Sequence, residues 1–361
     1  MIETLEIENF RGLPTMTFDL NRWNALYGPN GSGKTNVLDA INYISRPLTR
    51  LENLEMSGVY SFSRERGDDG PDIVLSASLV DDYRDPCRYV VRLTSDGRHA
   101  LLAEEVWISG NRARATAPSS VSAVMRTAVA DDMNDESPDS TEQWIRDQLK
   151  YVRRYSIDPA TARQASPSGL NTIINDGRNL PSALEDLNDS HPDRLEGISQ
   201  GMRRIFKGFQ NLRFVPYSET TTAIEFQFDG QWFNGARLSD GMASALALLF
   251  LASTPRGPQL IMLDEPESKL SPIAVMATLD AIDMLLENDR QVLLTTHSPH
   301  VLKWIINRGH AASQMTSRGP LSWQKILHLQ GIDSGTIHSD ELPISTLNCV
   351  GLLESFLHYD G

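Results

Sequence analysis

The sequence predicts an α/β protein that has a mostly parallel sheet in its C-terminal half and a strand-rich N-terminal lobe. Two observations carry this prediction. A glycine-rich stretch, Gly28 to Thr35, lies between an apolar run that suits a short strand and a segment whose apolar residues have helical spacing. In the C-terminal third, apolar strand-like runs alternate with helix-like segments, which is typical of a parallel sheet covered by helices.

The N-terminal lobe is expected to consist mainly of strands. Alternating apolar residues predict strands at 4–10, 16–20 and 23–27. A helix follows the glycine-rich stretch, with apolar residues at Val37, Leu38, Ile41 and Ile44. After a polar stretch over 46–70, further strands are expected at 72–79, 88–93 and 101–108.

The middle of the chain carries the weakest signals. Residues 111–141 are rich in acidic residues, serine and proline, and they predict a solvated loop with one helix at 121–130. Helices are then expected at 143–155, 180–188 and 195–209, and strands at 212–217 and 222–228.

The C-terminal third alternates regularly. A long apolar helix is expected from about 238 to 252, and apolar strands at 259–265 and 291–296. The elements predicted after these strands are helices at 272–287 and 301–306, a strand at 322–329 and a closing helix at 347–358.

Composition restricts the class of protein. The chain has 361 residues, of which 40% are hydrophobic and 22% charged, so it can form one large domain or two ordinary ones. The formal net charge of −14 argues against attraction of the whole molecule to nucleic acid or to an anionic membrane, although a local basic groove stays open.

The cysteines, Cys87 and Cys349, suit a reducing cytosol. The acidic N-terminus lacks the pattern of a signal peptide, and the longest apolar stretch, 243–252, is too short to span a bilayer. We therefore expect a cytoplasmic protein without a membrane partner.

One basic cluster needs a separate interpretation. Arg203, Arg204 and Lys207 fall on the polar side of the helix expected at 195–209. They could contact nucleic acid or form a solvated face. We favour the solvated face, because three basic residues are a small footprint on a protein of this net charge.

The stretch from Gly28 to Thr35 reads Gly-Pro-Asn-Gly-Ser-Gly-Lys-Thr, which completes the phosphate-loop (Walker A) pattern G-x-x-x-x-G-K-[ST]. Its backbone N–H groups can curl around phosphate oxygens, and the N-terminus of the following helix adds a partial positive charge. Lys34 is expected to reach the β- and γ-phosphates of ATP, and the Thr35 hydroxyl to bind Mg²⁺. The other residues expected to line the phosphates are Asn30, Gly31, Ser32 and Gly33.

Two further motifs lie at strand ends. Asp264 and Glu265 follow four apolar residues, and His297 follows the next apolar strand. Side chains at the C-terminal ends of parallel strands project into the crevice where α/β sheets bind ligands. Asp264 is therefore a candidate ligand of Mg²⁺, and Glu265 is a candidate general base that activates water. His297 is placed to contact the γ-phosphate or the water.

Ser239-Asp240-Gly241 opens the long apolar helix. Ser239 is expected to cap this helix, and the N–H groups that follow form an anion site. A chain that already has a phosphate loop needs this second site only if a second copy supplies the nucleotide.

In order along the chain, these motifs resemble the ABC-type ATPase heads of the SMC, RecF and OLD-like branch. Residues 5–12, Leu-Glu-Ile-Glu-Asn-Phe-Arg-Gly, also resemble the first strand of that branch. The resemblance implies one ABC-type head over 1–361. Its parts are an N-terminal lobe at 1–110 with Walker A, an inserted, partly disordered and helical segment at 111–210, and a lobe at 211–361 with the signature motif, Walker B and the switch histidine.

The resemblance also implies an assembly and an activity. In such heads two copies enclose two ATP molecules at their interface, so Lys34 and Thr35 of one copy would face Ser239 and Gly241 of the other. It implies ATP hydrolysis, with Asp264 on magnesium, Glu265 as catalytic base and His297 as switch histidine.

Two departures from the family pattern stand out. Where these heads often read Pro-Glu-Asn-Gly-Leu-His-Pro, this chain has Ser271 in place of the histidine and Lys269 in the dimer-contact loop, 268–271. The family's Q-loop glutamine is also missing between Thr35 and Glu142. The later candidates are Gln143, Gln148 and Gln164.

Several functions remain open at this level. The first is a dimeric ATPase that acts as a switch for a separate effector protein, as in the ATPase subunits of bacterial anti-phage systems. The second is a RecF-like DNA-binding repair ATPase, which the acidic balance disfavours. The third is a nucleotide-gated scaffold with little turnover. A rod-forming SMC arm is not expected because a long heptad insertion is absent, and nuclease activity is not expected because the 64 residues after His297 lack an Asp-x-Asp pair. The Asn-Phe-Arg-Gly signature argues against a transporter ATPase.

Overall fold

The computed structural model describes residues 1–45, 72–81, 84–95, 100–115, 119–120, 141–149, 152–255, 259–316 and 319–322, except Gly12, Pro14, Pro29 and Asn30. Several predictions lie outside these residues: the polar stretch at 46–70, the helices at 121–130 and 347–358, most of the strand at 322–329, and the position of Asn30.

A mostly parallel sheet forms the centre of the molecule. Its described strands run in the order β17-β16-β3-β15-β14-β9, and all but the edge strand β17 pair in parallel with their neighbours. The bounds are β3 Trp23–Tyr27, β9 Arg153–Tyr155, β14 Leu260–Asp264, β15 Gln291–Thr296, β16 Ala311–Thr316 and β17 Gly319–Ser322. The C-terminal ends of β3, β14 and β15 therefore meet at one edge of this sheet.

An antiparallel sheet forms the N-terminal lobe. Its order is β2-β1-β4-β5-β6-β7, with β8 also paired to β6. The bounds are β1 Ile2–Glu8, β2 Met16–Asp19, β4 Ile73–Asp81, β5 Arg84–Ser95, β6 Ala100–Ile108, β7 Asn111–Ala115 and β8 Ser119–Ser120. The strands predicted at 4–10, 16–20, 72–79, 88–93 and 101–108 are confirmed in this sheet. The strand predicted at 23–27 is confirmed as β3, but it belongs to the parallel sheet.

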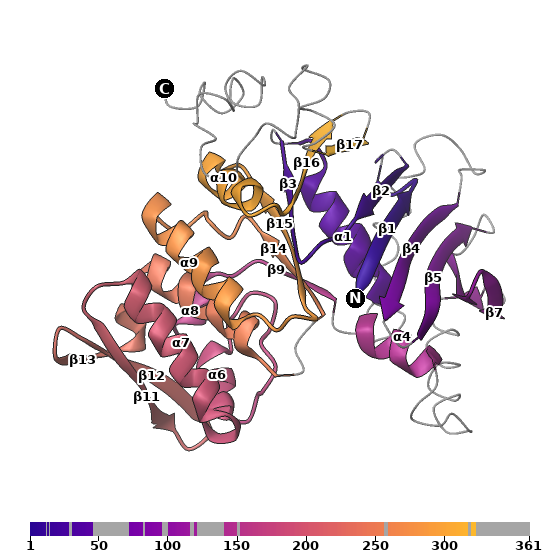
Figure 1. Cartoon of the computed structure of the whole chain (residues 1–361). Helices are drawn as coiled ribbons and strands as arrows, with labels where there is room; N and C mark the ends of the chain where they lie inside the picture. The colour runs from indigo at the N-terminus through magenta and orange to yellow at the C-terminus, as the bar shows by residue number, and fades with distance from the viewer. Residues whose placement is uncertain are drawn as a thin grey trace.

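Helices cover the parallel sheet on its two faces (Figure 1). On one face lies α1, between this sheet and the antiparallel one. On the other lie α6 to α10, together with a small antiparallel sheet. The helices are α1 Lys34–Ser45, α4 Thr141–Leu149, α5 Pro159–Ala162, α6 Leu180–Ser190, α7 Pro192–Ile205, α8 Asp240–Ser253, α9 Pro272–Leu285 and α10 Pro299–Asn307. The small sheet contains β10 Ser166–Pro167, β11 Phe209–Ser218, β12 Thr221–Phe228 and β13 Gln231–Asn234, which the short helix η2 Gly235–Arg237 follows.

Strand alternation divides the interior into two cores. Within β14, Ile261 and Leu263 belong to the core under α8, whereas Leu260 and Met262 belong to the core around α1. Successive side chains of a strand point to opposite faces, so each strand supplies both cores. As a result, α1 and α8 lie on opposite faces of the parallel sheet.

Two predicted helices are corrected by the structure. The helix expected at 143–155 ends at Leu149, and residues 153–155 form β9, which pairs in parallel with β14. The helix expected at 195–209 is α7, which ends at Ile205, and Phe209 begins β11. In the first case a neighbouring strand overrides the local helical pattern, because three residues gain stability as a strand only by pairing.

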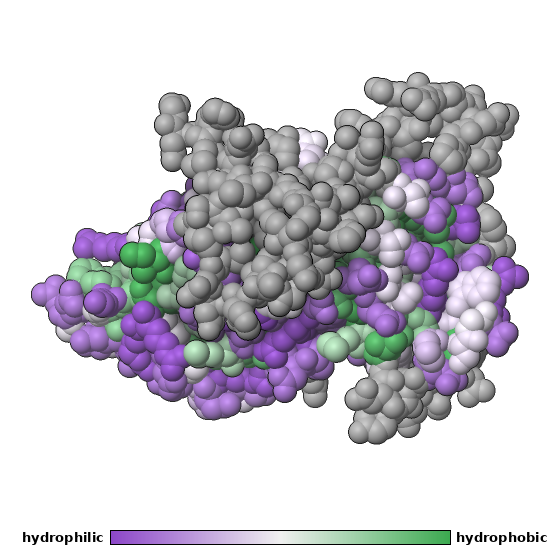
Figure 2. Space-filling model, turned by 45° about the horizontal axis from the view of Figure 1, so that its top comes forward, coloured by the Kyte–Doolittle hydropathy of each residue, from purple (hydrophilic) through white to green (hydrophobic). Residues whose placement is uncertain are grey.

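No helix in the described ranges has the length and apolar character needed to cross a membrane. On the face shown in Figure 2, hydrophilic residues cover most of the described surface, and the hydrophobic ones form small separate patches.

Candidate functional site

The glycine-rich turn between β3 and α1 depends on glycine at two positions. Gly31 and Gly33 have φ values of +77° and +91°, in the left-handed region that other residues seldom adopt. A Cβ on Gly33 would also lie only 2.7 Å from Cδ2 of Leu13. The first α1 hydrogen bond follows at once, from the N–H of Val37 to the carbonyl of Gly33, 3.0 Å. The turn therefore delivers the chain directly to the helix N-terminus.

Lys34 lies in this turn, buried rather than extended into solvent. Its Nζ donates a hydrogen bond to the carbonyl of Gly28, 2.8 Å, across the loop. Burial lowers the pKa of Lys34, and the nearby carboxylates of Glu265, Asp264 and Glu267 oppose that shift. The lysine thus faces the acidic groups at the end of β14.

Two hydroxyls complete the turn. Oγ of Ser32 is buried and has no hydrogen-bond partner within the described part of the chain. Thr35, in the first turn of α1, is exposed. A buried hydroxyl without a partner is costly unless a ligand supplies one, so this geometry suits an anion such as a phosphate.

Asp264, the last residue of β14, has both carboxylate oxygens engaged. Oδ1 accepts from the hydroxyl of Thr295, 2.6 Å, on the neighbouring strand β15. Oδ2 accepts from the guanidinium of Arg154, 2.6 Å, on β9 at the other side. Parallel pairing of β9, β14 and β15 positions all three side chains at one sheet edge.

Glu265 follows with a strained backbone. Its φ is +46°, in the left-handed region, and its N–H donates to Oγ1 of Thr295, 3.0 Å. Its carboxylate Oε1 lies 2.9 Å from Nε2 of His297, just beyond β15. A non-glycine residue in this region costs on the order of 1–3 kcal/mol and is common at functional sites. The turn separates the Glu265 carboxylate from that of Asp264.

The pKa of His297 is lowered, which favours the neutral imidazole at pH 7. Burial lowers its pKa below 6.5, the charge of Lys34 adds to this, and Glu265 opposes it. Its backbone N–H donates to a carboxylate oxygen of Glu267, 3.1 Å, and the hydroxyl of Thr296 donates to the same oxygen. Burial raises the pKa of Glu267. Glu267 therefore ties the loop after β14 to the end of β15.

The predicted signature residues lie elsewhere. Ser239 caps α8 by accepting from the N–H of Met242, 3.2 Å, and Asp240 pairs with Arg163 at 2.9 Å. A Cβ on Gly241 would lie 3.1 Å from the carbonyl oxygen of Lys269, so α8 begins beside the loop 268–271. Among the described residues, no hydrogen bond or ion pair joins Ser239 or Gly241 to the phosphate loop. The structure thus brings Lys34, Asp264, Glu265 and His297 together and leaves the signature residues apart.

No motif in the sequence predicts a residue for the place beside Asp264 that Arg154 occupies. Of the expected Q-loop glutamines, Gln164 is exposed and donates from Nε2 to the carbonyl of Ala160, 3.1 Å, whereas Gln148 lies in α4. The side chain of Gln143 lies outside the described residues. The sequence motifs do not indicate roles for Arg154, Thr295 or Glu267. Only a correct assignment of strand β9 could have indicated Arg154.

The basic cluster on α7 is partly neutralised. Arg203 pairs with Glu196 and donates to the carbonyl of Gln210, 2.8 Å. Arg204 donates to the sulfur of Met284. These contacts agree with the interpretation of a solvated face.

The oxygen donors of Asp264 and Thr35 suit Mg²⁺ better than a metal ion that is held by protein side chains alone. In the described ranges, no group of three or more His, Cys, Asp or Glu side chains can hold a metal ion. Mg²⁺ typically takes one or two protein oxygens and completes its shell with water and substrate phosphates. The carboxylate of Asp264 and the hydroxyl of Thr35 match this coordination preference.

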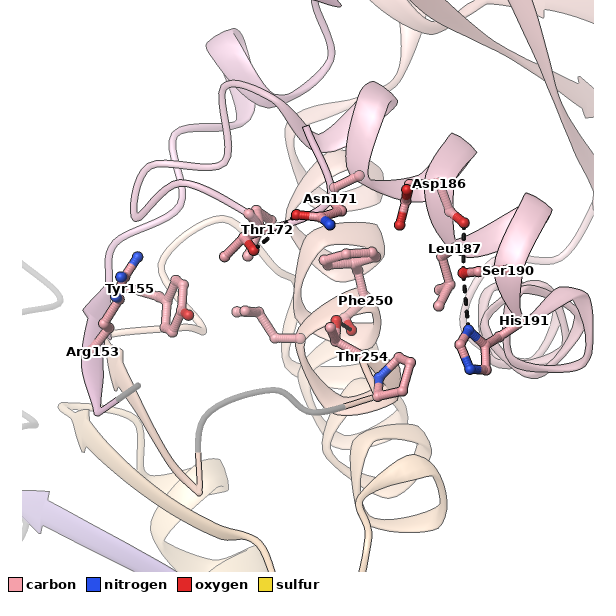
Figure 3. A pocket seen from close by; sticks show the side chains of 14 residues that line it. Arg153, Tyr155, Asn171, Thr172, Asp186, Leu187, Ser190, His191, Phe250 and Thr254 are labelled. Carbon is pink, nitrogen blue, oxygen red and sulfur yellow. Dashed lines mark hydrogen bonds between the residues drawn. The ribbon is translucent and has the colours of Figure 1, made fainter. Parts of the chain in front are cut away.

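A large cavity lies away from this edge. A cavity of about 40 Å³ lies beside Asp264 and Glu265. A much larger one, about 460 Å³, lies between β9, α6 and the end of α8. Figure 3 shows Arg153 and Tyr155 at one end of it and Ser190 and His191 at the other.

Comparisons with known proteins agree with this geometry. The profile of the AAA_21 family, described as "AAA domain, putative AbiEii toxin, Type IV TA system", matches residues 23–303. A segment of 45 residues is 44% identical to the DNA replication and repair protein RecF of Francisella tularensis subsp. novicida, covering 12% of this chain and 13% of that protein. The RecF of Chlorobium luteolum is 40% identical over 65 residues, 18% of this chain and 17% of its own length. The chain thus aligns with less than a fifth of these relatives.

Solved structures resemble the whole fold. An SMC head bound to the C-winged helix domain of ScpA matches with a TM-score of 0.60 and 16% identity, covering 90% of this chain and 99% of that one. The Pyrococcus furiosus Smc head domain with an extended coiled coil, bound to the C-terminal domain of ScpA, matches with a TM-score of 0.50 and 14% identity, covering 91% and 98%. The predicted fold class, an ABC-type ATPase head, is confirmed.

Proposed function

Because the chain belongs to the AAA_21 family of AAA-type ATPase domains, we propose that it binds and hydrolyses ATP as a dimer and acts as a nucleotide-driven switch for a separate effector protein. The observation that carries this proposal is the convergence of four groups at one sheet edge. Lys34 comes from the start of α1, Asp264 and Glu265 from the end of β14, and His297 from the end of β15.

Each group has a chemical task in this proposal. Lys34 neutralises the β- and γ-phosphate oxygens, and the N–H groups of Gly31, Ser32 and Gly33 bind phosphate oxygens around it. Because Lys34 already bonds to Gly28, its Nζ is positioned before nucleotide binds. Asn30 is proposed to complete this cradle.

Hydrolysis requires a base near the attacking water. Glu265 takes the water proton through its carboxylate. Neutral His297 has a single N–H, and Nε2 lies 2.9 Å from that carboxylate. This N–H can donate either to Glu265, which holds the base in place, or to the γ-phosphate. Thr35 and Asp264 would hold Mg²⁺, which supplies charge neutralisation at the phosphates when bound.

The separation of the signature residues supports a dimeric site. Ser239 and Gly241 lie at the start of α8, which packs on the opposite face of the sheet from α1. An anion site at a capped helix N-terminus can therefore serve the nucleotide of a second copy. We propose an ATP sandwich between two copies, closed by Ser239 and Gly241.

An effector partner is the next part of the proposal. The matched family is described as a putative toxin of a type IV toxin–antitoxin system, and the related SMC heads were solved bound to domains of ScpA. These descriptions support a head that transmits its nucleotide state to another protein. We place this chain in bacterial anti-phage defence in the cytoplasm, in line with the family resemblance of its motifs.

A RecF-like repair ATPase that binds DNA is the second candidate, favoured by the RecF similarity over 45 and 65 residues. The net charge of −14 and the pairing of Arg203 with Glu196 oppose it. A gel shift with duplex DNA at low salt, with and without ATP, separates the two. A shift that weakens steeply with salt supports the repair ATPase, and absence of a shift excludes it.

The proposed assembly is tested by light scattering after size-exclusion chromatography. The wild-type chain is expected to dimerise with ATP and Mg²⁺ under conditions that block hydrolysis. Ser239→Arg should stay monomeric, because the new side chain fills the anion site, whereas the exposed control Ser218→Arg should dimerise normally. Dimerisation of Ser239→Arg with ATP would contradict the composite site.

A further inference from the structure

Arg154 is placed at the metal carboxylate by strand register. In the β9–β14 pair, Arg154 lies opposite Met262, two residues before Asp264. Positions two apart in a strand share a face, so Arg154 and Asp264 project from the same face of the sheet, toward α1. The neighbours Arg153 and Tyr155 project from the other face, where they line the large cavity (Figure 3).

On that face Arg154 bridges two carboxylates. One guanidinium nitrogen lies 2.6 Å from Asp264, and the other lies 2.7 Å from Asp39 of α1. Asp39 in turn pairs with Arg11 at 2.7 Å. Burial by itself lowers the pKa of Arg154, but the hydrogen bonds and charges of Asp39 and Asp264 outweigh it and raise the pKa. The guanidinium therefore stays charged between the two acids.

This contact occupies the oxygen that a metal needs. Oδ1 of Asp264 accepts from Thr295, and Oδ2 accepts from Arg154. The Arg154 contact is charge-assisted, which makes it about twice as strong as a neutral hydrogen bond. A second cation at Asp264 must compete with Arg154 for this carboxylate and is also repelled by its charge.

We propose that Arg154 is a positioning residue that holds Asp264 in the nucleotide-free protein and competes with Mg²⁺ for it. The inference rests on the proposed binding of ATP with Mg²⁺ at this edge. Release of Arg154 from Asp264 then accompanies nucleotide binding, while Asp39 keeps the guanidinium on α1. Because Asp39 also binds Arg11, which follows β1, the exchange is linked to the antiparallel sheet.

The test measures how much free Mg²⁺ is needed for nucleotide binding. A non-hydrolysable fluorescent ATP analogue is held at constant concentration with the full-length protein while Mg²⁺ is titrated. For Arg154→Gln, we expect the Mg²⁺ midpoint to fall about tenfold, because one charge-assisted hydrogen bond no longer competes. Thermal unfolding without nucleotide should shift to lower temperature, since Asp39 and Asp264 lose their shared cation.

Arg194→Gln is the matched control. Arg194 is as exposed as Arg154, with 28% against 27% of the side chain accessible, and it also pairs with a carboxylate, that of Glu287 at 2.6 Å. It lies away from the sheet edge, so its loss should lower stability without moving the Mg²⁺ midpoint. Arg154→Lys keeps the charge but cannot bridge both acids, and its midpoint should lie between those of the wild type and Arg154→Gln.

The outcomes are distinct. A lower Mg²⁺ midpoint together with lower stability supports competition. If Arg154 had only a structural role, Arg154→Gln would lower stability and also weaken Mg²⁺-dependent nucleotide binding, which would raise the midpoint. A midpoint that is unchanged or raised in Arg154→Gln overturns the inference, and Arg154→Lys decides in the same way if Arg154→Gln does not fold. If the wild type binds nucleotide independently of Mg²⁺, or does not bind nucleotide at all, the proposed function is refuted instead.

Discussion

The two sides of β9 differ sharply. On the side toward α1, Arg154 is locked to Asp264 and Asp39 at 2.6 and 2.7 Å. On the opposite side, Arg153 and Tyr155 line a cavity of about 460 Å³ (Figure 3). The charged contacts of Arg154 and the large cavity thus lie on opposite sides of one short strand.

This difference shows that cavity size is a poor guide to the site in this molecule. A well-formed apolar pocket is the usual first candidate for a binding site. Here several polar groups at the sheet edge contact one another directly, and the polar contacts, not a large cavity, distinguish this edge. The large cavity lies away from these groups, between β9, α6 and the end of α8. If this view is right, substitutions on one side should change function and those on the other stability.

The largest effect is expected from Glu265→Gln. ATP turnover should fall by about 10²- to 10⁴-fold, since the variant loses the general base, while nucleotide binding and unfolding temperature stay near the wild-type values. Turnover is measured by phosphate release, and Glu225→Gln, on the small sheet, is the control. Unchanged turnover in Glu265→Gln would remove Glu265 as the base.

A substitution at the cavity should do the reverse. Phe250 is buried in α8 and lines the large cavity, so Phe250→Ala should lower the free energy of unfolding by about 3 kcal/mol. The dissociation constant for nucleotide should stay within twofold. Denaturant unfolding and fluorescence titration measure the two quantities. A large change in nucleotide affinity would show that the cavity and the sheet edge communicate through β9, and the separation drawn above would fail.

Glu267→Gln tests how stability depends on pH at the sheet edge that carries the charged groups. Burial raises the pKa of Glu267 above 4.5, so the folded state holds its proton more tightly than the unfolded state does. The contribution of Glu267 to stability is therefore fully present below pH 4.5 and is lost as the pH rises through the folded pKa, by at most about 1.4 kcal/mol per pH unit. Glu267→Gln should gain stability relative to the wild type over that window, as measured by unfolding at several pH values. A relative gain on acidification would contradict the assignment.

The smallest effect concerns two helix caps of nearly identical geometry. Ser239 and Ser271 each accept a hydrogen bond from the N–H three residues on, at 3.2 and 3.3 Å. Replacing either with alanine should cost about 1 kcal/mol of unfolding free energy. Equal losses would sharpen the view that Ser239 is an ordinary cap in the monomer. A loss at Ser239 of more than about 2 kcal/mol would indicate a further contact within one chain.

The fold class followed from short-range patterns. The strand, the glycine turn and the helix from Trp23 to Ser45 are visible because the φ values and hydrogen bonds involved lie within a few residues. The strand ends at Asp264 and Thr296 follow from apolar runs in the same way. The roles assigned to these residues stay predictions that the experiments above address.

Local sequence determined the glycine-rich turn before α1, the strand-end acids after β14 and the serine cap of α8, since each needs only contiguous residues. Tertiary structure alone decided that Arg154 meets Asp264, 110 residues away, and that Glu267 meets the end of β15. The reason is that β9 exists only through its pairing with β14: three residues that read locally as the end of a helix become a strand beside a partner, and its alternation then sends Arg154 to the site and its neighbours to the cavity.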